Sequence, residues 1–155
     1  MSRIEESIEV NVPLSTAYNQ WTQFEEFPRF MEGVERVRQL DDTHLEWTVK
    51  VGGKEHTWRA EITEQRPDER VAWRAVDGKE NGGAVTFERL SDTSTKVMVQ
   101  MDYEAEGLTE QLGSMLGADS RRVKGDLERF KELIESRGRE SGAWRGEVER
   151  GERVR

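Results

Sequence analysis

Two histidines are the side chains in this sequence best suited to proton transfer near neutral pH. His56 falls in a segment of alternating polarity and is expected on the inward face of a strand, whereas His44 lies beside a turn. A catalytic imidazole also needs an orienting partner and a reacting group within reach. Glu6 and Tyr103 share the expected inward face, but nothing in their spacing requires them to meet His56. We therefore expect no catalytic residues in this set.

Other catalytic and cofactor-binding chemistry is not indicated. The sequence has no cysteine and two histidines, which excludes disulfides, thiolate zinc sites and cysteine nucleophiles. The phosphate-binding, dinucleotide-binding, zinc-protease and nucleophile-elbow motifs are also missing from it. We expect neither a metal site nor a cofactor.

Three tryptophans form the most conspicuous apolar pattern. Trp47, Trp58 and Trp73 fall on expected neighbouring strands and share inward parity. Large aromatic side chains dominate protein cores, so the residue pattern favours a packed core. Ligand pockets are lined by the same residue types, and that alternative remains open.

Composition places the chain among acidic single domains. It has 155 residues, a formal net charge of −8 and a pI near 5.0. Nucleic-acid binding depends on clustered Lys and Arg that release counterions, so no nucleic-acid partner is expected. The N-terminus lacks the apolar core of a signal peptide, and no stretch approaches the roughly 18 apolar residues of a membrane span. We expect a cytoplasmic protein without stable membrane insertion.

The N-terminal part of the chain predicts one strand followed by two short helices. Apolar residues alternate with polar ones between Ile4 and Val12, the pattern of a half-buried strand. Helical spacing then continues to Pro28. This proline is expected to divide the region into two short helices, the second carrying Phe30 and Met31.

The rest of the chain predicts antiparallel strands and a long terminal helix. Strand-like segments in residues 34–103 are separated by hairpin-length turns such as Gly52–Gly53, which favours a meander over parallel units. Residues 81–83 are expected to bound a loop. Apolar residues recur at helical spacing over residues 108–134, and Gly138 is a suitable helix end.

These elements predict one α+β domain. An antiparallel sheet with one apolar face needs a cover, and the terminal helix is the only element long enough to provide it. We therefore predict a curved sheet of about seven antiparallel strands wrapped around the C-terminal helix, within one domain over residues 1–138. Residues 139–155 alternate Arg and Glu with intervening glycines, so we expect a disordered tail there.

Two segments resemble a known family. Residues 12–22 (VPLSTAYNQWT) and 24–31 (FEEFPRFM) resemble the polyketide cyclase/dehydrase and lipid-transport family, and residues 125–131 (GDLERFK) are similar to its closing helix. The resemblance extends over roughly residues 3–138. It implies the helix-grip fold of the START-like, birch-pollen-allergen-like superfamily (SRPBCC), with coenzyme Q-binding START-like proteins as near relatives. Members bind sterols, lipids, quinones or polyketides, or have no known ligand.

The resemblance further implies a cavity between the sheet and the helix, lined mostly by apolar side chains. The strand residues expected to line it are Trp47, Val49, Trp58, Trp73, Val85, Phe87, Val99, Met101 and Tyr103, with His56 as a hydrogen-bonding residue at the rim. The helix residues expected to close one end are Leu112, Met115 and Leu116.

Three functions remain open from the sequence. The first is binding or transport of a small hydrophobic ligand, such as a lipid, quinone or polyketide-like molecule. The second is an aromatase/cyclase-type enzyme that would use His56, Tyr103 and Glu6. The third is a partner-binding protein with a filled core. The sequence indicates neither the ligand nor the oligomeric state.

Overall fold

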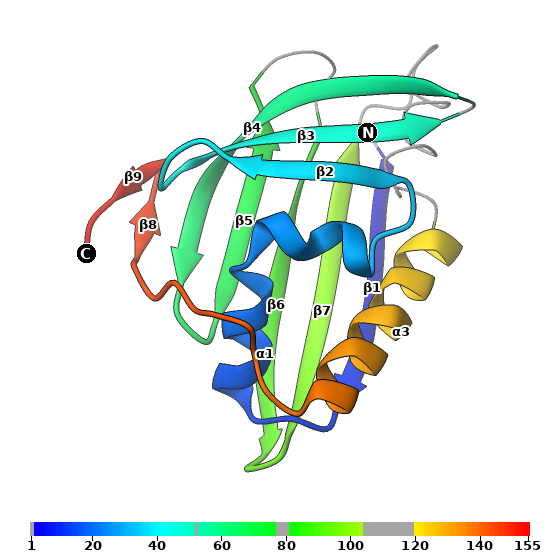
Figure 1. Ribbon diagram of the computed structural model, residues 1–155. Helices are drawn as coiled ribbons and strands as arrows, with labels where there is room; N and C mark the ends of the chain where they lie inside the picture. The colour runs from blue at the N-terminus through cyan, green and yellow to red at the C-terminus, as the bar shows by residue number, and fades with distance from the viewer. Residues whose placement is uncertain (1, 52, 77–80, 104–119) are drawn as a thin grey trace.

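The computed structural model describes residues 2–51, 53–76, 81–103 and 120–155 (Figure 1). The chain begins with strand β1 (Ser2–Val10), helix α1 (Leu14–Trp21) and a 3₁₀ helix η1 (Phe24–Arg29). Strands then follow as β2 (Val34–Gln39), β3 (His44–Val51), β4 (Lys54–Arg66), β5 (Arg70–Ala75), β6 (Asn81–Ser91) and β7 (Ser94–Tyr103). The described C-terminal elements are helix α3 (Ser120–Arg137) and the short strands β8 (Val148–Glu149) and β9 (Glu152–Arg153).

The strands form one curved antiparallel sheet in the order β1-β7-β6-β5-β4-β3-β2. The chain crosses from one edge to the other through α1 and η1, which lie with α3 on the concave side (Figure 1). The meander and the α+β helix-grip arrangement are therefore confirmed. Among the described residues the sheet has nine strands rather than about seven, because β8 and β9 add to its edge.

Local turn chemistry accounts for the connections between elements. Val51 pairs with Lys54 across the expected two-residue turn, and Gly53 takes a φ of 84° that favours glycine. At the other end of the domain, α3 stops at Arg137, and Gly138 follows with a φ of 72°. The part of the predicted helix before Ser120 lies outside the described residues.

The two N-terminal helices differ from the prediction in where they divide. α1 already ends at Trp21, where the Thr22 hydroxyl donates to the Asn19 carbonyl at 2.6 Å. Pro28 lies inside η1 rather than between two helices. Pro28 has no N–H to donate within η1, and the turn continues through Phe30 and Met31, whose N–H groups both donate to the Phe27 carbonyl.

An aromatic cluster closes the space between the sheet and α3 at one end. Trp21 of α1 lies 5.5 Å from the rings of Phe27 and Phe30 and 4.9 Å from Phe130 of α3. Trp21 and Phe130 are only 2% and 0% exposed. The cluster therefore joins both helical regions into one core.

The C-terminal segment, residues 139–155, is packed against the domain and not disordered as expected. Val148 is fully buried, and β8 pairs with β4 at Glu64 and Gln65. β3 pairs with β4 only as far as Glu61. Without β8, the part of β4 beyond Glu61 would have unpaired backbone groups on that side. Single apolar residues between charges carry no periodic signal, which is why the sequence pattern missed this docking.

Candidate functional site

A cavity of about 60 Å³ lies between the sheet and α3. A single water molecule needs roughly 10–15 Å³ on the same measure, so the cavity has room for a small group of atoms. Its described lining comes from α1, the loop after η1, five strands and α3, and consists of Trp21, Met31, Val34, Trp47, Val49, Trp58, Trp73, Val99, Met101, Val123, Asp126 and Leu127.

Half of this lining coincides with residues expected from the sequence. The residues in common are Trp47, Val49, Trp58, Trp73, Val99 and Met101. The alternation of polar and apolar residues along β3, β4, β5 and β7 correctly predicted that these side chains face inward. The strand register places Trp47 directly opposite Trp58. Their role in binding a ligand stays a prediction.

Three other expected residues, Val85, Phe87 and His56, are not part of the described lining of this cavity. Val85 and Phe87 are buried, and Phe87 packs edge-on against Tyr18 of α1 at 5.4 Å. Both side chains belong to the hydrophobic core, and Phe87 lies beneath α1. His56 is half-buried opposite Val49 but is not part of the lining.

The remaining expected residues fall where the structure gives no side-chain description. Tyr103 pairs through its backbone with Ser2 and Asn81, and nothing further is described for it. Leu112, Met115 and Leu116 lie outside the described residues.

The three tryptophans line the cavity from the neighbouring strands β3, β4 and β5. The rings of Trp47 and Trp58 are nearly parallel, with centroids 6.0 Å apart and planes 8° apart. Trp47 is 8% exposed, and Trp58 and Trp73 are half-buried although they face inward. Protein cores are close-packed, so large inward-facing side chains that are not fully buried leave space beside them.

Gly83 provides the room that Trp73 occupies. The two residues are opposite each other on β5 and β6, and a Cβ at position 83 would lie 2.9 Å from Cζ2 of Trp73. The same atom would lie 2.7 Å from the carbonyl oxygen of Gln100. Gly82 and Gly83 were expected to bound a loop, but both belong to β6. The close approach of an indole to the strand explains a glycine inside it.

The sequence pattern missed six lining residues. They are Trp21, Met31, Val34, Val123, Asp126 and Leu127. Val123 and Leu127 already belonged to the apolar stripe of the terminal helix, and Asp126 is adjacent to them at helical spacing. The position of Asp126 between Val123 and Leu127 on the apolar face of the helix was the one indication in the sequence that its side chain faces the cavity.

Asp126 is the one charged residue among the described residues that line the cavity. Its side chain is 14% exposed, and Oδ1 accepts the backbone N–H of Glu32 at 3.0 Å. It also accepts a hydrogen bond from the guanidinium of Arg129. Nε of Arg129 in turn donates to the carbonyl of Phe30 at 2.9 Å. These bonds join α3 to the loop that follows η1.

The candidate catalytic set is not assembled among the described residues. Glu6 on β1 is opposite Val99, whereas His56 is on β4. Strands β7, β6 and β5 separate β1 from β4. Neighbouring strands are about 4.8 Å apart, so the two side chains start from well-separated positions on the sheet.

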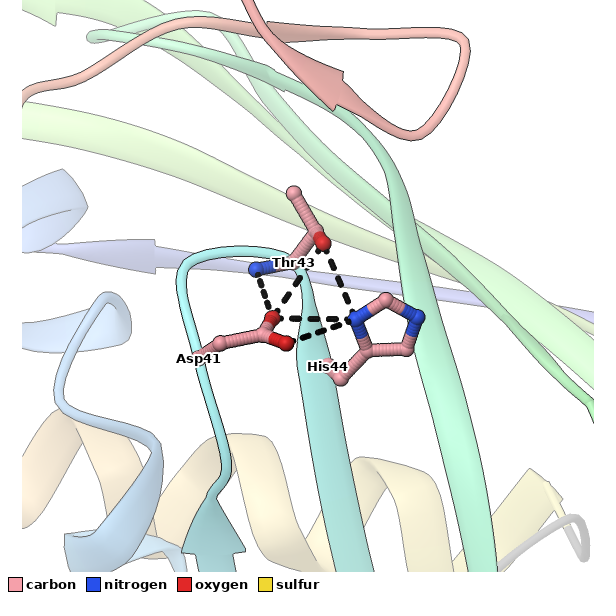
Figure 2. Close-up of polar contacts among 3 residues, drawn as sticks. All are labelled: Asp41, Thr43 and His44. Carbon is pink, nitrogen blue, oxygen red and sulfur yellow. Dashed lines mark hydrogen bonds and ion pairs between the residues drawn. The ribbon is translucent and has the colours of Figure 1, made fainter.

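The second histidine belongs to a polar turn outside the cavity (Figure 2). Nδ1 of His44 lies 2.9 Å from Oδ1 of Asp41 and 3.0 Å from the hydroxyl of Thr43. The backbone N–H of Thr43 donates to the same carboxylate at 2.8 Å, and with His44 it lowers the pKa of Asp41. The side chain of His44 is 41% exposed. The cluster fixes the turn between β2 and β3.

Two further tests of the described residues give negative results. They contain no group of three or more His, Asp or Glu side chains that could hold a metal ion. Within the same residues, no helix combines the length and apolarity that crossing a bilayer requires.

A family model for polyketide cyclase / dehydrase and lipid transport matches residues 10–132. The chain belongs to this family. A relative in Streptomyces lincolnensis, an uncharacterized 17.2 kDa protein, is 59% identical over 149 residues, which cover 96% of this chain and 99% of the relative. The family points to hydrophobic ligand binding or to a cyclase-type activity.

Solved structures agree on the fold of this family member. A Deinococcus radiodurans protein is 27% identical with a TM-score of 0.70, over 87% of this chain and 98% of that one. The Zhui aromatase/cyclase from a Streptomyces species is 18% identical with a TM-score of 0.73, over 92% and 99%. A START superfamily protein from Mycobacterium smegmatis is 14% identical with a TM-score of 0.70, over 85% and 98%.

Proposed function

We propose that this protein binds a small hydrophobic molecule in the cavity between the sheet and α3, as a carrier or sensor. The observation that supports this most is the incomplete burial of Trp58, Trp73 and Met101, which all face inward. The family match to lipid transport and polyketide chemistry points in the same direction.

The lining indicates how such a ligand is held. Apolar burial stabilises a complex by about 25 cal/mol per Å² before ordering and desolvation costs are subtracted. Eleven of the twelve described lining residues are apolar, and two of them, Met31 and Met101, carry flexible thioethers. A cavity of about 60 Å³ is small, so we infer that a ring or chain end is enclosed rather than a whole lipid.

Asp126 supports a second candidate function, a cyclase-type enzyme. A carboxylate beside an apolar cavity can accept a hydrogen bond from a ligand hydroxyl or take up a proton. His56 and Glu6 do not reach one another across the sheet, so this candidate rests on Asp126 and not on the set expected from the sequence. Binding of an apolar ligand is common to both functions.

Native mass spectrometry of freshly purified protein, with analysis of an organic extract, tests the binding function. A reproducible extra mass that is lost on denaturation and matched in the extract is the expected result. Trp58→Ala and Trp73→Ala should each reduce the fraction of protein that carries this mass. Trp144→Ala is the control, because Trp144 lies in the C-terminal segment and outside the cavity lining. A ligand mass that survives both cavity substitutions would refute the site.

A further inference from the structure

A second, more open pocket lies on the outer side of the loop that lines the cavity. It measures about 280 Å³ and is lined by Pro28, Arg29, Phe30, Met31, Glu32 and Arg129. We refer to it as the outer pocket. Three of its six described lining residues are charged, whereas Asp126 alone is charged among the described residues that line the cavity.

Met31 is the side chain that the outer pocket and the cavity share. It is half-buried, with one side toward each space. Methionine is unbranched and has three rotatable side-chain bonds, so it can move aside at lower cost than a branched or aromatic residue. Met31 is therefore an adaptable side chain that borders both spaces.

Hydrogen bonds from α3 hold the backbone on both sides of Met31. Nε of Arg129 donates to the carbonyl of Phe30 at 2.9 Å, and Oδ1 of Asp126 accepts the N–H of Glu32 at 3.0 Å. Arg129 and Asp126 also bond to one another, and Arg129 lies 3.6 Å from the carboxylate of Glu32. Two side chains of α3, one beside each pocket, thus hold the backbone next to Met31, while the buried ring of Phe30 anchors the start of the loop in the aromatic cluster.

Backbone hydrogen bonds hold the two ends of this loop unequally, and the Gly33 carbonyl accepts the N–H of Lys50 at 2.9 Å. Met31 donates its N–H to the Phe27 carbonyl at 2.8 Å, but the bond from Val34 to the Met31 carbonyl is longer, at 3.4 Å. Gly33, between them, has a φ of 88°, which other residues rarely adopt. A glycine next to the start of β2 is a suitable pivot for a short displacement.

We propose that the outer pocket is the entrance to the cavity, with Met31 as its gate and the Arg129–Asp126 pair as the latch. This inference rests on the proposed function. The ligand it fits is amphipathic: its apolar end passes Met31 into the tryptophan-lined cavity, and its polar end stays beside Arg29 and Glu32. Opening requires the loop bonds of Arg129 to break, so this residue controls the rate of exchange more than the affinity.

Stopped-flow fluorescence with anilinonaphthalene sulfonate, which has apolar rings and one anionic group, tests the entrance. Arg129→Gln should raise both the association and the dissociation rate by about tenfold, because a charged donor is lost from the latch, with little change in Kd. Met31→Trp should slow both rates by about tenfold. Circular dichroism establishes that each variant is folded.

Two matched controls accompany these variants. Arg137→Gln makes the same change two turns along α3, where Arg137 bonds to Gln20 and Glu26 instead of the loop. Leu40→Trp introduces the same bulky ring at an exposed position, 42% accessible. Both controls should leave the probe kinetics at the wild-type values.

The outcomes separate the entrance from the cavity. Unchanged rates in Arg129→Gln and Met31→Trp, together with a lower probe affinity in Trp58→Ala, would overturn the entrance alone. Probe affinity that is insensitive to Trp58→Ala would overturn the proposed function and the entrance with it. Opposite rate changes in the two variants, with both controls unaffected, would establish the gate.

Discussion

Substitution of Gly83 by alanine is the sharpest test of how the cavity wall is built. The added Cβ would lie 2.9 Å from Cζ2 of Trp73 and 2.7 Å from the carbonyl oxygen of Gln100. One of these contacts is with a side chain that can shift and the other with backbone in the middle of the sheet. Because overpacking of this kind costs about 1–3 kcal/mol, we expect Gly83→Ala to lower the unfolding free energy by about 2 kcal/mol.

The two contacts can be separated with a second substitution. In a Trp73→Ala background the clash with the indole disappears, and only the contact with the Gln100 carbonyl remains. The cost of Gly83→Ala should therefore be smaller there than in the wild-type protein, and the difference is the coupling energy between the two positions. Urea denaturation followed by circular dichroism measures all four proteins.

The same chemical change at another glycine supplies the control. Gly125 lies inside α3, and a Cβ there would lie 3.3 Å from the end of the Arg129 side chain, a contact that a small shift of that side chain relieves. Gly125→Ala should stabilise the protein by up to about 1 kcal/mol through helix propensity. For a domain of this size 1 kcal/mol corresponds to about 2–4 °C in Tm, so the two variants should melt on opposite sides of the wild type. A neutral Gly83→Ala would refute the close approach of Trp73 to β6.

Two further predictions concern the C-terminal segment and the core beneath α1. Val148→Asp places a charge at a fully buried position and should release residues 139–155, so trypsin should cleave this segment faster. The control is Val154→Asp, at a residue that is 49% exposed, which should leave the cleavage rate unchanged. Equal cleavage of the two variants would contradict the docking. Burial raises the pKa of Tyr18 to about 12, so the unfolded state ionises first and stability should fall as pH rises from about 10 through about 12. Tyr18→Phe should flatten this alkaline loss in pH-dependent denaturation, and an unchanged slope would refute it.

Most of the fold followed from local pattern. Period-two alternation identified the strands and placed Trp47 and Trp58 on one face, and the structure pairs them directly across β3 and β4. The Gly52–Gly53 signal marked the turn between these strands. Gly138 marked the end of the terminal helix. Each of these depends on a few consecutive residues, so the sequence contains the information.

Docking of the C-terminal segment could not be read in the same way. Its burial rests on isolated residues such as Val148, which lies among charges and glycines. What determines its position is the unpaired edge of β4 beyond Glu61, and that edge exists only because β3 starts at His44. The docking position therefore depends on β4 being longer than β3, and not on a pattern within residues 139–155.

The sequence by itself determined which side chains face the inside of the sheet, because alternation depends only on backbone geometry. Tertiary structure alone decided which of them line a cavity. Val85 and Phe87 have the same inward parity as Trp73 and Met101, but Tyr18 and Trp21 of α1 pack over Phe87. Asp126 reaches the cavity because α3 crosses the sheet where Arg129 and the loop at Glu32 hold it. Parity gives the side of a sheet, whereas the space above each residue depends on which distant element packs there.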